Sequence, residues 1–469
     1  MSVNSPPLRA ARSGSFELRA PALDARRSSS RNWIGVLGVG GLLVTGLLVA
    51  LAAADTSKLL PQTLSAGIGQ VGLAGSFGTT GLHLGSAGLT IVIVAMFVSY
   101  LLTVRSAGRL SPLLVLGAIA GLHALMLLAP PLFSTDVFSY QFYGRIGALY
   151  HANPYTAGPH ALALDPLYFY VGQKWYATPT AYGPLFTALS YVLTPLSIPA
   201  NVFAYKAIAA VSSLAVVALV WNGARLRGVD QIRAVALVGL NPLIVVYGVG
   251  GGHNDLLMLA LLVAGVVFLL QRRERVGGGS IVAAAAIKVT AGVLLPFALA
   301  GARGPDGPLY LSRRRNVLVG AGVALAALAV FTVAMFGAGP LHLPGTIATV
   351  QGKGNWQSVP GFIGTRLGLG TVSHSTALIL GALFAVALVW LTVRVWRGQL
   401  DWIAGAGWAS IALLLTAGSL LPWYVAWVMP LAALGRDGRL WRASLVLTCV
   451  IGCFQILAYI PHGNAVLGL

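Results

Sequence analysis

The chain alternates between long apolar runs and short polar stretches that contain arginine or lysine. A run of about 18 or more apolar residues is long enough to cross a bilayer as a helix. Open sheet edges cannot be satisfied in lipid, so the runs are predicted to be helices. The pattern predicts an all-α polytopic membrane protein with about 11–13 transmembrane helices. The runs are 33–54, 88–104, 112–129, 183–198, 202–222, 232–248, 256–270, 281–300, 317–336, 375–395, 402–421, 425–434 and 444–460.

Composition supports the membrane class and argues against a nucleic-acid partner. The chain is 57% hydrophobic and 9% charged, with a mean hydropathy of +0.82. That is too little charge for the surface of a soluble protein of this length. The net charge of +19 could indicate nucleic-acid binding. However, the basic residues form short clusters between apolar runs, which is typical of cytoplasmic loops. The expected partner is therefore the lipid bilayer.

Residues 1–31 and 32–469 differ in character. The first segment contains arginines among serine, proline and alanine, and it is predicted to be a disordered basic cytoplasmic tail. The apolar run that follows is too long for a secretory signal, so we expect an uncleaved first span. With the tail inside, three crossings place the long loop 131–182 outside, and later crossings do the same for 337–374. We expect a multi-pass plasma-membrane protein with a cytoplasmic N-terminus.

Strict alternation of sides fails twice, between Asp136 and Arg225 and between Arg275 and Arg313. The charge bias is statistical, and some loops could break it. Alternatively, one segment in each interval is a half-span or re-entrant, which is tolerated where backbone lines a cavity. The glycines at 277–279, together with Lys288, make the second interval the better candidate.

Asp136 is one of only 11 acidic residues, and it follows an apolar run. An ionisable residue near membrane depth indicates a functional site. Asp136 could be a general base, a metal ligand or a structural ion paired with Arg145 or His151. A metal ion would require further oxygen ligands, but the residue after Asp136 is Val137, which offers no side-chain oxygen. We therefore expect no metal and no other cofactor.

The outer segments collect aromatic, amide and basic side chains. Aromatic rings and amides suit a sugar, although tyrosine and tryptophan also gather at membrane interfaces without binding a ligand. The glycine-rich turn at 250–255 precedes a helix start that suits a phosphate, or is simply a capped helix. The candidate substrate-binding residues are Tyr140, Tyr143, Arg145, Asn153, Tyr155, Tyr182, His253, Asn254, Asp255, Lys288, Lys353, Trp356, Arg366, Trp423 and Tyr424.

Several short motifs together carry a family resemblance. They are Thr135-Asp136-Val-Phe-Ser-Tyr140, Asn153-Pro-Tyr155, Tyr182-Gly-Pro184, Asn241-Pro242, Gly251-Gly-His253-Asn254-Asp255 and Pro422-Trp-Tyr424. With these motifs the chain resembles the polyprenol-phosphate-mannose-dependent alpha-1,6-mannosyltransferases of actinobacteria, the MptA/MptB type of the GT-C superfamily. The resemblance extends from about residue 33 to the C-terminus.

The resemblance implies that residues 32–469 form a GT-C-type transmembrane catalytic domain with an outward-facing cavity. The implied donor is a polyprenyl-phosphate sugar, polyprenyl-phosphate-mannose, and the implied acceptor is a mannan or lipoglycan. Transfer would invert the donor linkage, with Asp136 as the general base. Some GT-C families carry a paired acidic motif and a metal; the valine after Asp136 puts a metal in doubt.

Two alternatives remain open. The first is a GT-C transferase for another lipid-linked sugar. The second is a transporter or flippase for a polyprenyl-linked glycan, which would predict charged residues at mid-membrane and internal repeats. Neither feature is evident in the sequence, where the polar groups gather toward one face.

Overall fold

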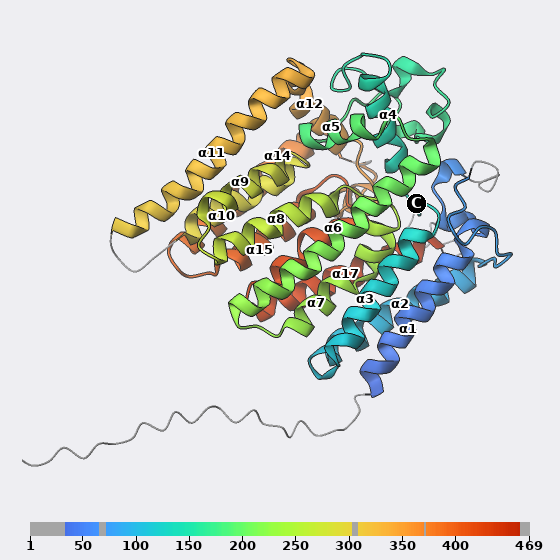
Figure 1. Ribbon diagram of the computed structural model, residues 1–469, viewed down its shortest axis with the longest axis horizontal. Helices are drawn as coiled ribbons and strands as arrows, with labels where there is room; N and C mark the ends of the chain where they lie inside the picture. The colour runs from blue at the N-terminus through green and yellow to red at the C-terminus, as the bar shows by residue number, and fades with distance from the viewer. Residues whose placement is uncertain (1–32, 65–71, 303–307, 370–371, 460–469) are drawn as a thin grey trace, which may run out of the picture.

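The computed structural model describes residues 33–64, 72–302, 308–369 and 372–459, so the predicted tail lies outside the described residues. Within these ranges the chain is helical and contains no strand, which confirms the predicted all-α class. The helices pack side by side as a bundle (Figure 1). The α-helices are α1 Trp33–Ala52, α2 Ser86–Ser106, α3 Pro112–Leu128, α4 Asp136–Ala148, α5 Pro184–Leu193, α6 Ile198–Arg227, α7 Gln231–Gly239, α8 Asp255–Leu270, α9 Glu274–Ala285, α10 Leu294–Gly301, α11 Pro308–Phe336, α12 Leu343–Gly352, α13 Val359–Arg366, α14 His374–Trp396, α15 Trp402–Thr416, α16 Met429–Leu434 and α17 Gly438–Tyr459.

Fewer helices than predicted are long enough to cross a bilayer alone. Among the described residues, 6 helices pass by length and composition, or up to 7 if the bent pair Gln231–Gly239 and Leu243–Val249 is one span. Other apolar helices have only 10–17 residues. At about 1.5 Å per residue these are shorter than the roughly 30 Å hydrocarbon layer. The count of 11–13 crossings therefore remains a prediction.

The run 281–300 was expected to be one crossing, and the structure breaks it. Helix α9 ends at Ala285, and Lys288 has extended backbone angles of φ −149° and ψ 120°. A 3-10 helix, Val289–Val293, and then α10 follow the break. The run is apolar as predicted, but Lys288 divides it: α9 ends before this lysine, and the short helices that lead into α10 follow it.

Helix α9 begins and helix α10 ends on the same side of the bundle. Arg313, near the start of α11, binds Glu274 at the start of α9 with an N–O distance of 2.7 Å. The adjacent Arg314 donates a hydrogen bond of 3.1 Å to the carbonyl of Leu299, near the end of α10. The pair therefore has the geometry of the re-entrant alternative raised for this interval.

The backbone at Gly183, directly before α5, supplies hydrogen bonds to the break. The amides of Gly183 and Leu185 donate to the carbonyls of Ile287 and Ala286 at 3.0 and 3.1 Å. A Cβ at position 183 would lie 2.2 Å from the Ala286 oxygen, so the approach requires glycine. Non-helical backbone is tolerated in such a place because protein groups satisfy it. Helix α5, which begins here, has 10 residues and is the short segment of the other interval.

A second irregular segment leads to the glycine turn. Pro242 lacks an amide hydrogen, and a π-helix, Leu243–Val249, follows it. The Asn241 side chain accepts from the Leu243 amide at 3.0 Å and donates to the Tyr100 hydroxyl at 3.2 Å. The segment ends in a turn where Gly252 has φ +66°, a value that favours glycine. This wide turn sets the position of His253.

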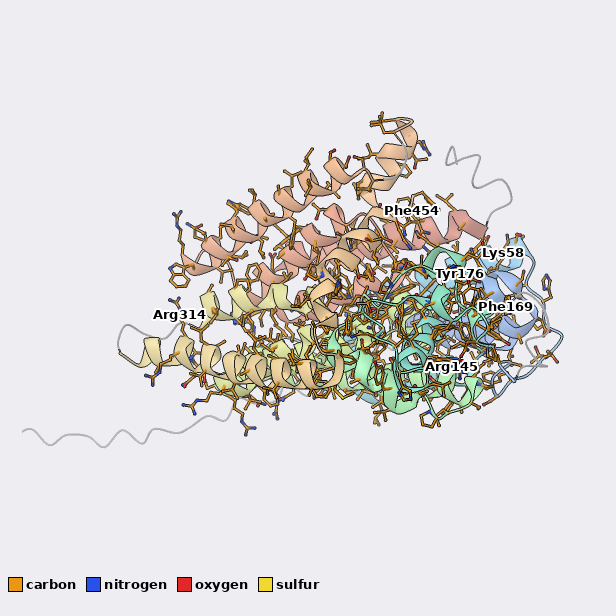
Figure 2. All side chains as sticks on the ribbon, turned by 90° about the horizontal axis from the view of Figure 1, so that it is seen from above. Lys58, Arg145, Phe169, Tyr176, Arg314 and Phe454 are labelled. Atoms are coloured by element: carbon orange, nitrogen blue, oxygen red, sulfur yellow. The ribbon has the colours of Figure 1, made fainter. Side chains whose placement is uncertain are left out.

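The two ends of the bundle differ in chemistry. Helices α4 and α5 lie together at one end, and the turn between α6 and α7 lies at the other (Figure 1). Figure 2 shows Arg314 far from Arg145 and Tyr176 along the length of the molecule. Arg227 pairs with Asp401 at 2.8 Å at the same end as Arg314. We call this the basic end and the opposite end, with α4, the cavity end.

Candidate functional site

A cavity opens at the cavity end, between α4 and three segments distant from it in sequence. Its space is about 1040 Å³, including the open mouth. Binding pockets for small molecules combine apolar walls with a few convergent polar groups. The lining includes Asp136, Ser139, Tyr143, Trp175, Thr178, Tyr182, Lys288, Thr290, Gln351, Tyr424 and Trp427.

Asp136 is the first residue of α4, where the helix dipole favours a carboxylate. Its amide donates to the Ser134 hydroxyl at 3.1 Å, which fixes the start of the helix. Its Oδ2 atom lies 3.3 Å from Nδ1 of His253, and the Tyr140 hydroxyl donates to the same oxygen at 3.5 Å. The Asp136 side chain is 20% exposed, toward the cavity that it lines.

Two opposing effects act on the pKa of Asp136. Burial raises it, and His253 and Lys288 lower it by more, so the pKa lies below its usual value. An opposite charge within a few ångströms has this effect because it favours the ionised form. The carboxylate is therefore charged at neutral pH and able to accept a proton.

His253 is held by its surroundings rather than by hydrogen bonds to its ring. It is 1% exposed, and it stacks on Trp423 with 3.4 Å between ring centroids and an interplanar angle of 16°. Neither ring nitrogen makes a hydrogen bond with other described residues. Its 3.3 Å contact with Asp136 is therefore an ion-pair geometry when the ring is protonated.

Lys288 and Asp255 form a second charged pair in the wall. The Lys288 ammonium lies 2.8 and 3.0 Å from the two carboxylate oxygens of Asp255. Trp427 donates its ring N–H to the same carboxylate at 2.7 Å. Lys288 also lies over the ring of Tyr424, 4.6 Å from its centroid. The unwound backbone at Lys288 thus delivers a cation to the cavity, while the buried Asp255 is satisfied.

Several other predicted residues lie at or near this cavity. Tyr143 and Tyr182 line it, and Tyr143 donates to the carbonyl of Thr178 at 2.9 Å. Lys353 donates to the hydroxyl of Thr178 and lies 5.1 Å from the centroid of the Trp175 ring. Burial and the neighbouring Lys174 lower the pKa of Lys353. Lys353 therefore stands beside the lining, at the Trp175 wall.

A further group of predicted residues has structural contacts. Arg145 pairs with Asp165 at 2.8 Å, so it is not the counterion of Asp136. Asn153 donates to the carbonyl of Phe336 at 2.7 Å, which ties the loop to the end of α11. Tyr155 is buried and donates toward Thr187 at 3.1 Å. None of Arg145, Asn153 and Tyr155 belongs to the lining of the cavity.

Of the remaining predicted residues, one lies near Asp136 and two lie outside the lining of the cavity. The side-chain oxygen of Asn254 lies 3.4 Å from the Tyr140 hydroxyl, which also contacts Asp136, so Asn254 lies near that carboxylate. Trp356 packs edge-on against Phe454 at 5.8 Å, and Arg366 lies over the Phe362 ring at 4.9 Å. Trp356 and Arg366 are not among the residues that line the cavity.

Sequence reasoning missed polar atoms that have no partner. The hydroxyls of Ser139 and Thr290 and the amide nitrogen of Asn254 are buried and make no hydrogen bond to any residue that the structure describes. Ser139 and Thr290 line the cavity. Unpaired buried polar atoms are costly and call for an explanation, such as a ligand. A lone serine or threonine in an apolar run gives no signal of this kind.

The described residues contain no group of three or more histidine, cysteine, aspartate or glutamate side chains that could hold a metal ion. The expectation that no metal is required stays a prediction. The polar groups at the cavity can instead supply a carboxylate, an ammonium group and hydroxyls.

Comparison with known proteins gives two family matches. Residues 32–303 match the model described as alpha-(1->6)-mannopyranosyltransferase, N-terminal domain. Residues 356–468 match the model described as MptB C-terminal domain. The first match contains Asp136, His253 and Lys288, and the second contains Tyr424 and Trp427. Most of the cavity wall thus lies within the matched segments, whereas Gln351 lies between them.

Three curated relatives are similar over much of the chain. A probable alpha-(1->6)-mannopyranosyltransferase of Mycolicibacterium smegmatis is 29% identical over 70% of this chain and 66% of its own length. Alpha-(1->6)-mannopyranosyltransferase A of Mycobacterium tuberculosis is 30% identical over 66% of this chain and 62% of its own length. Alpha-(1->6)-mannopyranosyltransferase B of Corynebacterium glutamicum is 30% identical over 66% and 56%. The chain thus spans about two thirds or less of these relatives. No solved structure matches it.

Proposed function

This chain belongs to the alpha-(1->6)-mannopyranosyltransferase family of the MptA/MptB type, and we propose that it is an integral-membrane mannosyltransferase. It transfers mannose from polyprenyl-phosphate-mannose to a mannan or lipoglycan acceptor and forms an alpha-1,6 link. The cavity end faces outward across the plasma membrane, and the basic end faces the cytoplasm. The charge bias of cytoplasmic loops supports this orientation.

One observation carries the proposal: an ionised carboxylate and a lysine lie in the wall of one aromatic cavity, beside hydroxyls that have no hydrogen-bond partner in the described part of the chain. The carboxylate suits proton removal from an acceptor hydroxyl. The lysine suits the charge that develops on a phosphate leaving group. The tyrosine and tryptophan side chains suit the apolar face of a sugar. Each group meets a separate need of sugar transfer from a lipid phosphate.

The reaction balances without an added metal. The acceptor 6-hydroxyl oxygen attacks the anomeric carbon of the donor mannose and passes its proton to the Asp136 carboxylate. The bond between that carbon and the phosphate oxygen breaks, and its electron pair leaves with the polyprenyl phosphate. Attack opposite to the leaving group inverts the anomeric centre, so a beta-linked donor gives an alpha product.

The first test replaces Asp136. Asp136→Asn and Asp136→Ala, assayed with polyprenyl-phosphate-mannose and a mannoside acceptor, should each transfer mannose about 10²–10⁴-fold more slowly, the range that general base catalysis contributes. Asp55→Asn, a carboxylate outside the cavity lining, is the matched control and should stay near the wild-type rate. Thermal unfolding of each variant checks that the fold is kept.

Near-normal transfer by folded Asp136 variants would contradict the role of this carboxylate. The same assay after treatment with EDTA tests the metal-free mechanism, and loss of transfer that added metal restores would refute it. Transfer of a different sugar in preference to mannose would leave the site intact but change its substrate.

A further inference from the structure

Lys206 is a buried lysine on a membrane-spanning helix, and the proposed reaction does not use it. It lies on α6, in the half nearer the cavity end, and it is 1% exposed. It does not belong to the lining of the cavity. Among the described residues, no carboxylate forms an ion pair with its ammonium group. An ionisable side chain in such a place is costly to keep and indicates a function.

The ammonium group of Lys206 holds the segment that leads from α3 to Asp136. It donates hydrogen bonds to the backbone carbonyls of Ala129 and Pro130, the latter at 2.9 Å. These carbonyls come directly after the last turn of α3, where the helix dipole favours a cation. Farther along the segment, Phe133 has φ +60°, which is strained for a side chain of this size. Contacts with other parts of the protein therefore hold this segment in place.

The apolar stem of Lys206 packs against the turn that carries His253. Gly252 in this turn has φ +66°, and a Cβ there would lie 3.3 Å from Cγ of Lys206. The same Cβ would lie 2.7 Å from Cγ1 of Val137, the residue after Asp136. Gly252 thus lies in close contact with both α6 and α4, and Lys206 supports it from α6.

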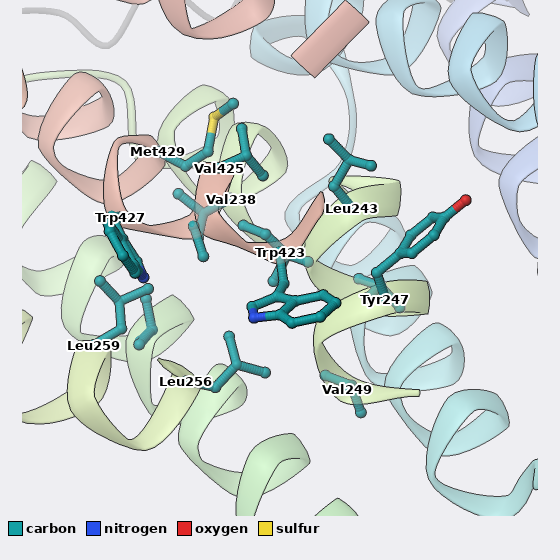
Figure 3. Packing of buried hydrophobic residues seen from close by; sticks show 14 of the residues in the cluster. Val238, Leu243, Tyr247, Val249, Leu256, Leu259, Trp423, Val425, Trp427 and Met429 are labelled. Carbon is teal, nitrogen blue, oxygen red and sulfur yellow. The ribbon is translucent and has the colours of Figure 1, made fainter. Parts of the chain in front are cut away.

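Other contacts join the same two segments. The amide of Leu132 donates to the carbonyl of Gly250 at 3.1 Å. His253 stacks on Trp423, and Figure 3 shows Trp423 beside the π-helix that leads into the glycine turn. The 3.3 Å contact between Asp136 and His253 therefore depends on how the segment after α3 is placed against this turn.

We infer that Lys206 is a positioning residue for the pair of Asp136 and His253. Its ammonium group fixes the segment before Asp136, and its stem supports the turn before His253, so the two together set the contact between these side chains. Lys206 acts through the pair, since it lies outside the lining of the cavity. The inference rests on the proposed function for its kinetic readout, whereas the positions of the two segments can be measured without a substrate.

Lys206→Met is the principal variant, because methionine keeps most of the apolar stem and removes the N–H donors. Lys206→Arg keeps a charge and donors, and it should lie closer to the wild type than Lys206→Met in every measurement. His123→Leu is the matched control. His123 is also 1% exposed, and it joins α3 to α6 through a contact of 2.8 Å with the Ser213 hydroxyl. This control removes a buried ionisable group from the same pair of helices.

Hydrogen exchange of the full-length protein in lipid nanodiscs, without substrate, tests the positions of the two segments. The amides of Leu132 and His253 make backbone hydrogen bonds of 3.1 and 3.0 Å, so both should be protected in the wild type. In Lys206→Met both should exchange at least about tenfold faster, the effect of losing hydrogen bonds from a charged donor. In His123→Leu both should exchange at the wild-type rate.

Mannosyl transfer tests the consequence for the reaction. Besides His253, the titratable groups that face Asp136 are Lys288, Asp255 and the hydroxyls of Tyr140, Tyr143, Tyr182 and Tyr424. Of these groups, His253 directly follows the glycine that Lys206 supports.

In Lys206→Met the turn should shift and His253 should move away from Asp136, so the acidic limb of kcat/KM against pH should move to higher pH. At the pH optimum kcat should fall about tenfold to 10²-fold, the effect of a small misplacement, with KM nearly unchanged. Adding Lys206→Met to His253→Gln should move the limb no further than His253→Gln alone, because both changes act on one contact. His123→Leu should leave the limb in place.

Wild-type exchange at both segments, or an unmoved limb, in folded Lys206→Met would overturn the inference. Shifts that add in the double variant would also overturn it, because the two residues would then act separately. If Lys206→Met does not fold, Lys206→Gln carries the same test, since glutamine keeps only an amide donor on a shorter stem. Loss of folding in the methionine, glutamine and arginine variants alike would assign Lys206 to the fold alone and reject the positioning role.

The two failures are distinguishable. Faster exchange in Lys206→Met, in a protein whose wild type transfers no mannose, would support the positioning of the pair and refute the proposed function. Normal transfer by the wild type, with unchanged exchange and an unmoved limb in Lys206→Met, would keep the proposed function and refute the inference.

Discussion

At the residue scale, the charge of Asp136 depends on partners that are distant in sequence. Burial by itself raises the pKa of this carboxyl, whereas His253 and Lys288 lower it. Because the ionised form is the proton acceptor in the proposed reaction, kcat/KM should fall as the pH drops through this pKa. In the wild type that fall lies below the usual range of an aspartate.

His253→Gln removes the nearest group that lowers the pKa of Asp136 and leaves the effect of burial. The pKa of Asp136 should therefore rise, and the acidic limb of the plot of kcat/KM against pH should move to higher pH. His83→Gln, at an exposed histidine whose Nδ1 contacts the carbonyl of Asp55, is the matched control and should leave the limb in place. A limb that stays in place or moves to lower pH in His253→Gln would contradict the assignment.

Sequence reasoning reached Asp136 because acidic residues are rare in this chain and an apolar run ends beside it. It could not identify which residues surround the carboxylate. His253 approaches through the π-helix and the glycine turn, and neither Arg145 nor His151 is the counterion that the structure pairs with Asp136. Contacts between distant segments depend on the packing of the whole bundle, which periodicity does not encode.

At the element scale, the apolar runs predict helices well and predict breaks poorly. The run 281–300 has the composition of one span, but two amides from Gly183 and Leu185 satisfy its exposed carbonyls. Those donors are about a hundred residues away in the sequence, so local patterns give no sign of them. The glycines at 277–279, Lys288 and the disturbed charge alternation were the signs in the sequence that this segment differs from a simple crossing.

Gly183→Ala tests the packing of this break. The new Cβ would lie 2.2 Å from the Ala286 oxygen, so the two backbones must separate and their hydrogen bonds weaken. We expect a stability loss of about 1–3 kcal/mol, measured by thermal or chemical unfolding in detergent. Mannosyl transfer should also fall, because Lys288 follows the displaced segment.

Gly117→Ala on α3 is the control for this prediction, since nothing lies within 4 Å of a Cβ there. It should keep wild-type stability and transfer. If Gly183→Ala behaves like Gly117→Ala in both measurements, the close approach at Ala286 does not constrain the fold.

At the scale of the whole molecule, the bundle separates a basic end from a cavity end. The sequence predicted this polarity from its arginine clusters, and the ion pairs of Arg227 and Arg313 join several of those clusters at one end. The sequence did not show which apolar runs are divided into short helices, because hydropathy measures apolar length and not helix continuity.

Cysteine labelling in intact cells tests which way the molecule faces. In a variant whose native Cys449 and Cys453 are replaced by alanine, Lys174→Cys at the cavity end should react with a membrane-impermeant thiol reagent. Arg225→Cys, exposed at the basic end, should react only after the membrane is permeabilised. The opposite result would place the cavity on the cytoplasmic side and would contradict the proposed outward transfer.

The two hydrogen bonds between Gly183–Leu185 and the unwound segment also have a thermodynamic consequence. Tyr182, which precedes the donor Gly183, lines the cavity, and Lys288 follows Ile287, the acceptor of that hydrogen bond. A displacement of one segment is therefore transmitted to the other through adjacent peptide groups. If a ligand that contacts Tyr182 changes the affinity for a ligand at Lys288, the reverse change must be equal. Binding of either substrate would in this way change the affinity for the other before any bond breaks.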